Sequence, residues 1–198
     1  MNKKSMAITL SLAVVAILVG VGIGVYNYTS STSAEGGTDS GIIVGLRGSD
    51  IAVAKTLDDF GDGRGSLEAL CFDMDMVNIA TGQVIGTAED CLAEVADGTN
   101  GGLLLTGTTF FNFPEGQLVS RGRTSVHPLN ERAPGAVFTH ITGAIPAPGS
   151  NQVLRGTGRF DGAAGTVRLS GAVDLSGFSG EGTPITFDCL FEINLRDG

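Results

Sequence analysis

Asp73 and Asp75 are the residues whose type and spacing first suggest chemistry. They lie two places apart in an alternating run, Leu70–Val77, so both carboxyl groups share one face of the predicted strand. If that face is enclosed, burial and mutual repulsion would raise both pKa values, and the pair becomes a candidate catalytic acid and base. If the face meets solvent, the two aspartates are ordinary solubilising charges. The sequence leaves both interpretations open.

The three cysteines divide into a predicted disulfide and a free thiol. Cys71 and Cys91 lie at equal distances from Thr81, so a hairpin symmetric about that residue would place them directly opposite each other, close enough for a disulfide. Cys189 lies on the apolar face of its own predicted strand, where we expect a buried, inert thiol. No cysteine or histidine pair has the spacing of metal ligands, so we expect no metal and no cofactor.

Alternating apolar residues separated by glycine-rich turns predict an all-β domain. The clearest alternation runs over Thr166–Val173, and a second runs over Ile185–Ile193. The segment Arg155–Gly162 has some likeness to a dinucleotide-binding glycine loop. However, its third glycine comes one place late, and a strand follows where that motif requires a helix. We therefore expect these glycines to bend the backbone between strands.

Three elements follow one another between Gly61 and Leu195. The first is a strand, Leu70–Val77, followed by a turn, Ile85-Gly86 and Cys91. The second is an aromatic strand, Thr108–Phe113, followed by Gly116–Gly122. The third is a Gly-x-Gly-x-Phe-x-x-Ala-x-Gly element, found here as Gly156, Gly158, Phe160, Ala163 and Gly165. With these elements the chain resembles the allene oxide cyclase and dirigent families, and the resemblance implies an eight-stranded antiparallel barrel.

The resemblance also implies where a site would lie. Asp73 falls where plant allene oxide cyclases carry an Asn, and Cys91 matches a cysteine of the following strand. The families' first strand carries a catalytic Glu, whereas Ile42–Ala54 contains none, so the cyclase site is incomplete. Dirigent proteins use Asp and Arg side chains in the barrel lumen. Arg121, Arg123 and Arg168 lie in predicted strands and could play such a part, although no matching motif carries any of them over. We expect Cys91, Phe110 and Arg121 to bind ligand beside Asp73 and Asp75, the candidate catalytic residues.

The N-terminal segment predicts export. Two lysines precede an apolar run, Met6–Val25, which is long enough to span a bilayer. We expect Met1–Ser31 to form a transmembrane or signal helix, retained as an anchor, with cleavage and secretion as the alternative. Residues 32–40 form a polar linker and residues 41–198 the barrel. The lysines before the span would keep the N-terminus in the cytoplasm and place the barrel outside.

Charge and architecture together limit the function. The net charge is −9, and nucleic-acid binding requires clustered Lys and Arg, so we expect no nucleic-acid partner. An eight-stranded barrel has room for packed side chains or for one small ligand. We expect a membrane-tethered, extracytoplasmic barrel that binds a small apolar molecule, with a dirigent-like or cyclase-like role. The alternatives are a non-catalytic binding module and a structural surface domain with a filled core.

Overall fold

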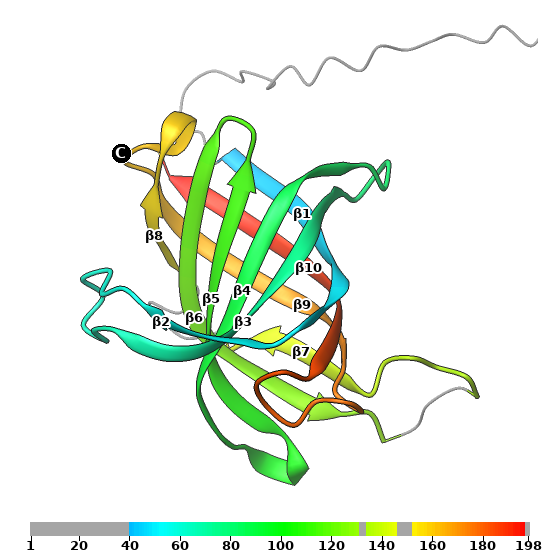
Figure 1. The fold of residues 1–198 in the computed structure, drawn as a ribbon. Coiled ribbons are helices and arrows are strands. Elements are labelled where there is room, and N and C mark those ends of the chain that lie inside the picture. The colour runs from blue at the N-terminus through cyan, green and yellow to red at the C-terminus, as the bar shows by residue number, and fades with distance from the viewer. Residues whose placement is uncertain (1–39, 131–133, 146–151, 197–198) are drawn as a thin grey trace, which may run out of the picture. The chain divides into compact units, whose positions relative to one another are not determined.

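The computed structural model describes residues 40–130, 134–145 and 152–196, which fold into an antiparallel β-sheet that closes on itself (Figure 1). The predicted N-terminal helix and nearly all of the predicted linker lie outside these residues, because the first strand begins at Ser40. Within the described part of the chain, no helix has the length and apolar character needed to cross a membrane. The structure therefore tests the prediction of a barrel, whereas the predicted N-terminal helix lies outside the described residues.

Ten strands and two short 3-10 helices make up the described chain. Their bounds are β1 Ser40–Ile51, β2 Val53–Leu57, β3 Leu67–Asn78, β4 Val84–Asp97, η1 Thr99–Gly101, β5 Leu103–Phe113, β6 Gly116–Pro128, β7 His140–Ala144, β8 Gln152–Gly156, η2 Gly158–Phe160, β9 Ala164–Asp174 and β10 Pro184–Arg196. Every pairing between them is antiparallel.

The strands form a ring in the order β1-β10-β9-β7-β6-β5-β4-β3. Pairing of Val44–Arg47 in β1 with Asp75–Asn78 in β3 closes that ring. β7 and β8 both lie between β6 and β9, so they share one place in it. The prediction of an all-β, antiparallel ring of eight strands is confirmed, and its form is that of a barrel.

Alternation along the strands lines the interior of this barrel with apolar side chains. On β10, the predicted apolar face of Ile185–Ile193 is buried inside, including Cys189. Phe72 of β3 meets Phe187 at 5.6 Å between ring centroids, and Phe111 of β5 meets Phe191 at 5.3 Å. These edge-to-face pairs link β10 across the interior to β3, on the far side of β1, and to β5, on the opposite wall.

A second apolar cluster lies on the outer face of β3, β4 and β5. We call it the outer cluster; its members are Leu57, Leu67, Ala69, Cys71, Cys91 and Ala93, with Phe110 packed against them. It forms because β2 continues beyond β1 after Ala52 and pairs with the first part of β3. The loop of residues 58–66 follows β2, and its Phe60 ring packs on Phe110 at 6.1 Å between centroids. This stretch of sheet is therefore buried on both faces.

The glycine-rich segment makes the predicted tight bend. β8 ends at Gly156, η2 follows, and β9 then runs back along the sheet. Gly158 has φ of +62°, and a Cβ atom on Gly156 would lie 1.7 Å from the carbonyl oxygen of Phe160, so both positions require glycine. Phe160 is buried and packs on Phe113 at 5.1 Å between ring centroids. This end of the barrel is filled.

Candidate functional site

The barrel interior contains a cavity of about 280 Å³. Val95 at the end of β4 and Ser179 in the β9–β10 loop line it and are exposed, so the cavity opens at that end of the barrel. The β5–β6 hairpin and the filled end lie at the opposite end (Figure 1). Most of the cavity wall is aliphatic or aromatic. The arrangement is a pocket that opens at this end of the barrel, of a size just below that usual for small-molecule sites.

Asp90 on β4 places a carboxyl group in this apolar wall. Its side chain is buried and accepts a hydrogen bond of 2.7 Å from the Thr109 hydroxyl. Asp90 pairs in register with Thr109 on β5, and Thr109 pairs with Ser120 on β6. All three residues line the cavity. They form a polar row across three adjacent strands, which we call the Asp90 row.

Burial changes the acidity of two groups in the cavity wall. Removal from water raises the pKa of Asp90 to about 6, although the hydrogen bond from Thr109 acts in the opposite direction. Burial also raises the pKa of the Cys189 thiol to about 12, and the negative charge of Asp90 adds to this effect. Asp90 can therefore exchange a proton near neutral pH, whereas Cys189 stays a neutral thiol.

The predicted catalytic pair lies elsewhere. Asp73 and Asp75 are both exposed on the outer face of β3, while Phe72, Met74 and Met76 point inward. The backbone N–H of Asp73 donates a hydrogen bond of 2.8 Å to the carboxylate of Asp50, near the end of β1. The enclosed face that the acid–base interpretation required is thus not found at these residues. Both side chains are exposed to solvent, and their catalytic role stays a prediction.

The predicted ligand-binding residues Cys91, Phe110 and Arg121 come together, but on the outer face. Cys91 and Phe110 belong to the outer cluster. The guanidinium of Arg121 is buried beside it, donates a hydrogen bond of 2.9 Å to Thr108, and pairs with Asp62 at 3.1 Å. Its Cζ lies 5.0 Å from the centre of the Phe60 ring. Arg121 thus fastens the loop of residues 58–66 to the barrel wall, and its ligand-binding role stays a prediction.

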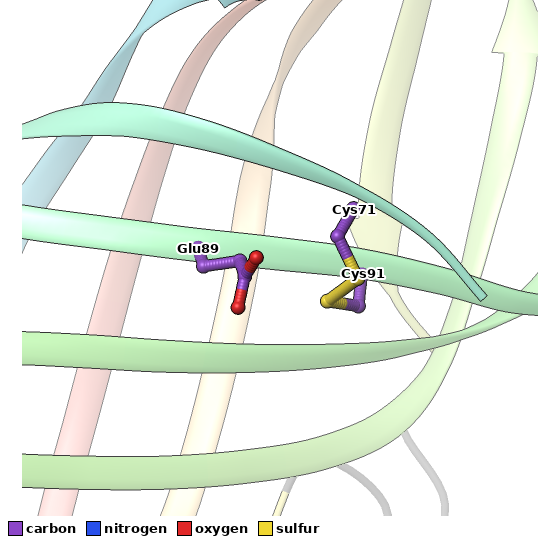
Figure 2. Close-up of side chains that lie close together, drawn as sticks. All are labelled: Cys71, Glu89 and Cys91. Carbon is purple, nitrogen blue, oxygen red and sulfur yellow. A yellow bond between two sulfur atoms is a disulfide. The ribbon is translucent and has the colours of Figure 1, made fainter. Parts of the chain in front are cut away.

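Cys71, Glu89 and Cys91 are close neighbours on β3 and β4 (Figure 2). Their potential ligand atoms all lie within 4.8 Å of one another, a spacing at which two thiolates and a carboxylate can hold a metal ion. Here the two sulfur atoms form the predicted disulfide, and Glu89 pairs with Lys55 of β2. The hydrogen bond to Glu89 raises the pKa of Lys55. The group is a covalent link and an ion pair that join β2, β3 and β4.

Peptide mapping without reduction should recover Cys71 joined to Cys91, because the two residues are in register with Cα atoms 4.0 Å apart. Cys189 should resist alkylation until the protein is unfolded, since it is buried and its thiol stays protonated. Denatured protein, in which Cys189 should react, is the control for reagent access. A Cys91–Cys189 peptide, or rapid labelling of the native protein, would contradict this arrangement.

The cavity and the Asp90 row are together the part of the described structure best suited to chemistry. An apolar pocket with one titratable carboxyl group can enclose a small molecule and exchange a proton with it. The sequence-based prediction missed Asp90, although its register opposite Phe72 is a signal that could have found it. In comparisons with known proteins, no family model matches the chain and no curated protein sequence matches it.

Proposed function

We propose that this protein binds a small, largely apolar molecule in the barrel lumen. The observation that carries the proposal is the cavity of about 280 Å³ with its apolar wall. Close packing is the rule in protein interiors, so a void of this size between buried aromatic side chains is a feature to be explained. A barrel with a filled core would not leave it.

Binding would draw on the hydrophobic effect. At about 30 Å³ per water molecule, the cavity has room for roughly nine water-sized atoms, which is a ligand of about nine heavy atoms. Each methylene group buried in it should contribute about 0.8 kcal/mol. The N-terminal apolar run supports a membrane-tethered, extracytoplasmic location, where such molecules would be met at a lipid surface.

The chain's likeness to the allene oxide cyclase and dirigent families supports the same proposal, since it rests on elements that form walls of this barrel. The Gly-Phe-Ala-Gly element supplies the bend and the buried ring that fill one end. A cyclase-like or isomerase-like reaction is the second candidate, and the observation that favours it is Asp90. A carboxyl group with a pKa of about 6 is suited to general acid–base catalysis.

Calorimetric titration of the full-length protein with octan-1-ol, an apolar probe of suitable size, tests the proposal. Gly107 faces the cavity from β5, and a Cβ atom there would make only ordinary contacts. Gly107→Leu should therefore place about four carbon atoms in the pocket and weaken octanol binding by about tenfold or more. The leucine should not unfold the protein, because it enters space that is otherwise unfilled.

Gly143→Leu is the matched control. Gly143 lies on β7 next to Thr142, whose side chain lines the cavity, so a side chain at Gly143 would point to the outer face. Its Cβ would meet the Leu169 carbonyl oxygen at 3.5 Å, an ordinary contact. Both variants carry the same N-terminal segment, so any octanol held there cancels in the comparison. Equal affinity in the two variants, or no binding to the wild type, would refute the proposal.

A further inference from the structure

Asp90 is a carboxyl group whose capacity for hydrogen bonds is mostly unused within the described structure. An ionised carboxylate can accept about four hydrogen bonds, and the one from Thr109 occupies a single position on Oδ1. Among the described residues that line the cavity, none is a lysine, arginine or histidine. The negative charge of ionised Asp90 therefore has no partner of opposite charge among the described residues of the cavity wall.

A buried charge without a partner is costly, and folded proteins rarely retain one outside functional sites. Burial raises the pKa of Asp90 to about 6, so above that pH the folded protein carries this charge in the lumen. Arg121, a buried cation on β6, is directed to the opposite side of the sheet and paired there with Asp62. The missing partner must come from outside the wall.

We infer that the lumen selects molecules with an apolar body and a cationic amine, whose ammonium group pairs with Asp90. The inference rests on the proposed function and names the class of ligand for the same pocket. It also implies that the pocket rejects apolar carboxylates such as fatty acids, because their charge would meet Asp90 with no basic group to offset the repulsion.

The Asp90 row has the acceptors that an ammonium group requires. A primary ammonium has three N–H donors and no acceptor. Asp90 supplies carboxylate oxygens, Thr109 keeps lone pairs on the hydroxyl whose proton goes to Asp90, and Ser120 adds a hydroxyl at the same level of the barrel. An alkyl chain attached to the ammonium would run along the aliphatic wall toward the mouth.

The energetic balance favours the amine over a neutral alcohol. Bringing an ammonium group out of water is costly, and a buried ion pair often gains little when both charges must be desolvated. Here folding has already desolvated the carboxylate, so binding must desolvate only the ligand's charge. The attraction between the two charges is also stronger in an apolar pocket than at a surface.

Three probes of equal length test the inference on the full-length protein at about pH 8, where Asp90 is ionised. These are octylamine, octan-1-ol and octanoate, each titrated by calorimetry. Octylamine should bind at least about tenfold more tightly than octan-1-ol, and octanoate at least about tenfold more weakly. The alkyl chain is the same in all three, so the differences report the head group.

Asp90→Asn should remove this selectivity. The amide is uncharged, so octylamine affinity should fall to that of octan-1-ol, while octan-1-ol binding should change by less than about threefold. Asp188→Asn is the matched control, because Asp188 is an exposed aspartate on the outer face of β10, paired with Arg47. Asp188→Asn should leave the order of the three affinities unchanged.

If Asp90→Asn does not fold, proton release by the wild-type protein on binding can test the inference instead. At about pH 5 most Asp90 is protonated, so binding of an ammonium should release about one proton, and octan-1-ol none. Calorimetry in two buffers of different ionisation enthalpy counts that proton. Cys189, which faces Asp90 from β10, stays protonated at this pH and does not contribute.

The outcomes separate the two proposals. If octan-1-ol binds in the lumen but octylamine binds no more tightly and releases no proton, the amine inference is overturned and the proposed function stands. The amine inference is also overturned, with the proposed function intact, if Asp90→Asn keeps the preference for octylamine. If octan-1-ol does not bind to the wild type, the proposed function itself fails, and the inference fails with it.

Discussion

Replacing Phe160 with alanine is expected to lower the free energy of unfolding by about 3 to 5 kcal/mol, the usual cost of truncating a buried aromatic side chain. The ring is 4% exposed and packs on Phe113 inside the filled end of the barrel. The glycines around it bring the backbone so close that the segment has little freedom to collapse into the space left behind. Urea denaturation of wild type and variant measures the difference.

Phe178→Ala is the matched control for this prediction. Phe178 lies in the β9–β10 loop at the open end, where it is only half-buried and its ring centroid is 6.1 Å from that of Phe72. Losing a half-buried ring beside an existing cavity should cost less than losing Phe160. A Phe160→Ala protein with the wild-type urea midpoint would show that this ring does not support the core.

Asp90→Asn is expected to raise the free energy of unfolding by about 3 kcal/mol at about pH 8 and to have little effect at about pH 3. The pKa of the buried carboxyl is about 6, against an ordinary value of 3.8. Between these values the folded protein holds a proton that the unfolded chain has released, so wild-type stability falls as pH rises. At 1.36 kcal/mol per pH unit, this difference gives the stated magnitude.

The asparagine carries no charge and still offers an acceptor to Thr109, so it should remove this pH-dependent loss. Denaturation of both proteins from about pH 3 to pH 8 measures their difference, in which the contributions of all other carboxylates cancel. Asp188→Asn, on the exposed face of β10, should produce no such trend. A difference between wild type and Asp90→Asn that stays constant with pH would contradict the assignment of a raised pKa.

Much of the fold could be predicted because alternation and turn residues act locally. The symmetric register about Thr81 placed Cys71 opposite Cys91, and the structure confirms both the register and the disulfide. A bulge occurs in the same hairpin, but it lies between Met76 and Val77, on the turn side of the cysteines. Cys189 is buried as predicted, because it lies on the apolar parity of its strand.

The candidate site was harder to predict, although one part of it follows from the same register. If Cys71 faces Cys91, Phe72 faces Asp90, so a carboxyl group must lie on the apolar face of that hairpin. The sequence-based prediction chose the pair Asp73 and Asp75 and did not include Asp90. Two charged residues on one face of a strand are typical of a face exposed to solvent. A single charged residue among the apolar residues of the inward face is a stronger sign of a buried functional site.

The surroundings of Arg121 could not be predicted, because they depend on a long-range contact. Its strand position gives the face of the sheet, but only the path of the loop of residues 58–66 brings Phe60 and Asp62 over that face. Nothing local in the loop indicates that it folds back. The same contact partly covers Phe110, which alternation alone would leave exposed on an outer face.

The wall formed by β3, β4 and β5, covered inside by the core and outside by the outer cluster, has a consequence for how the barrel opens. Backbone amides buried on both sides of a sheet exchange with solvent only through the largest unfolding events. β1 and β3, by contrast, are joined only over Val44–Arg47 and Asp75–Asn78. We therefore expect the barrel to open first between β1 and β3. The amides of β3, β4 and β5 that are covered on both faces should be the slowest to exchange hydrogen for deuterium.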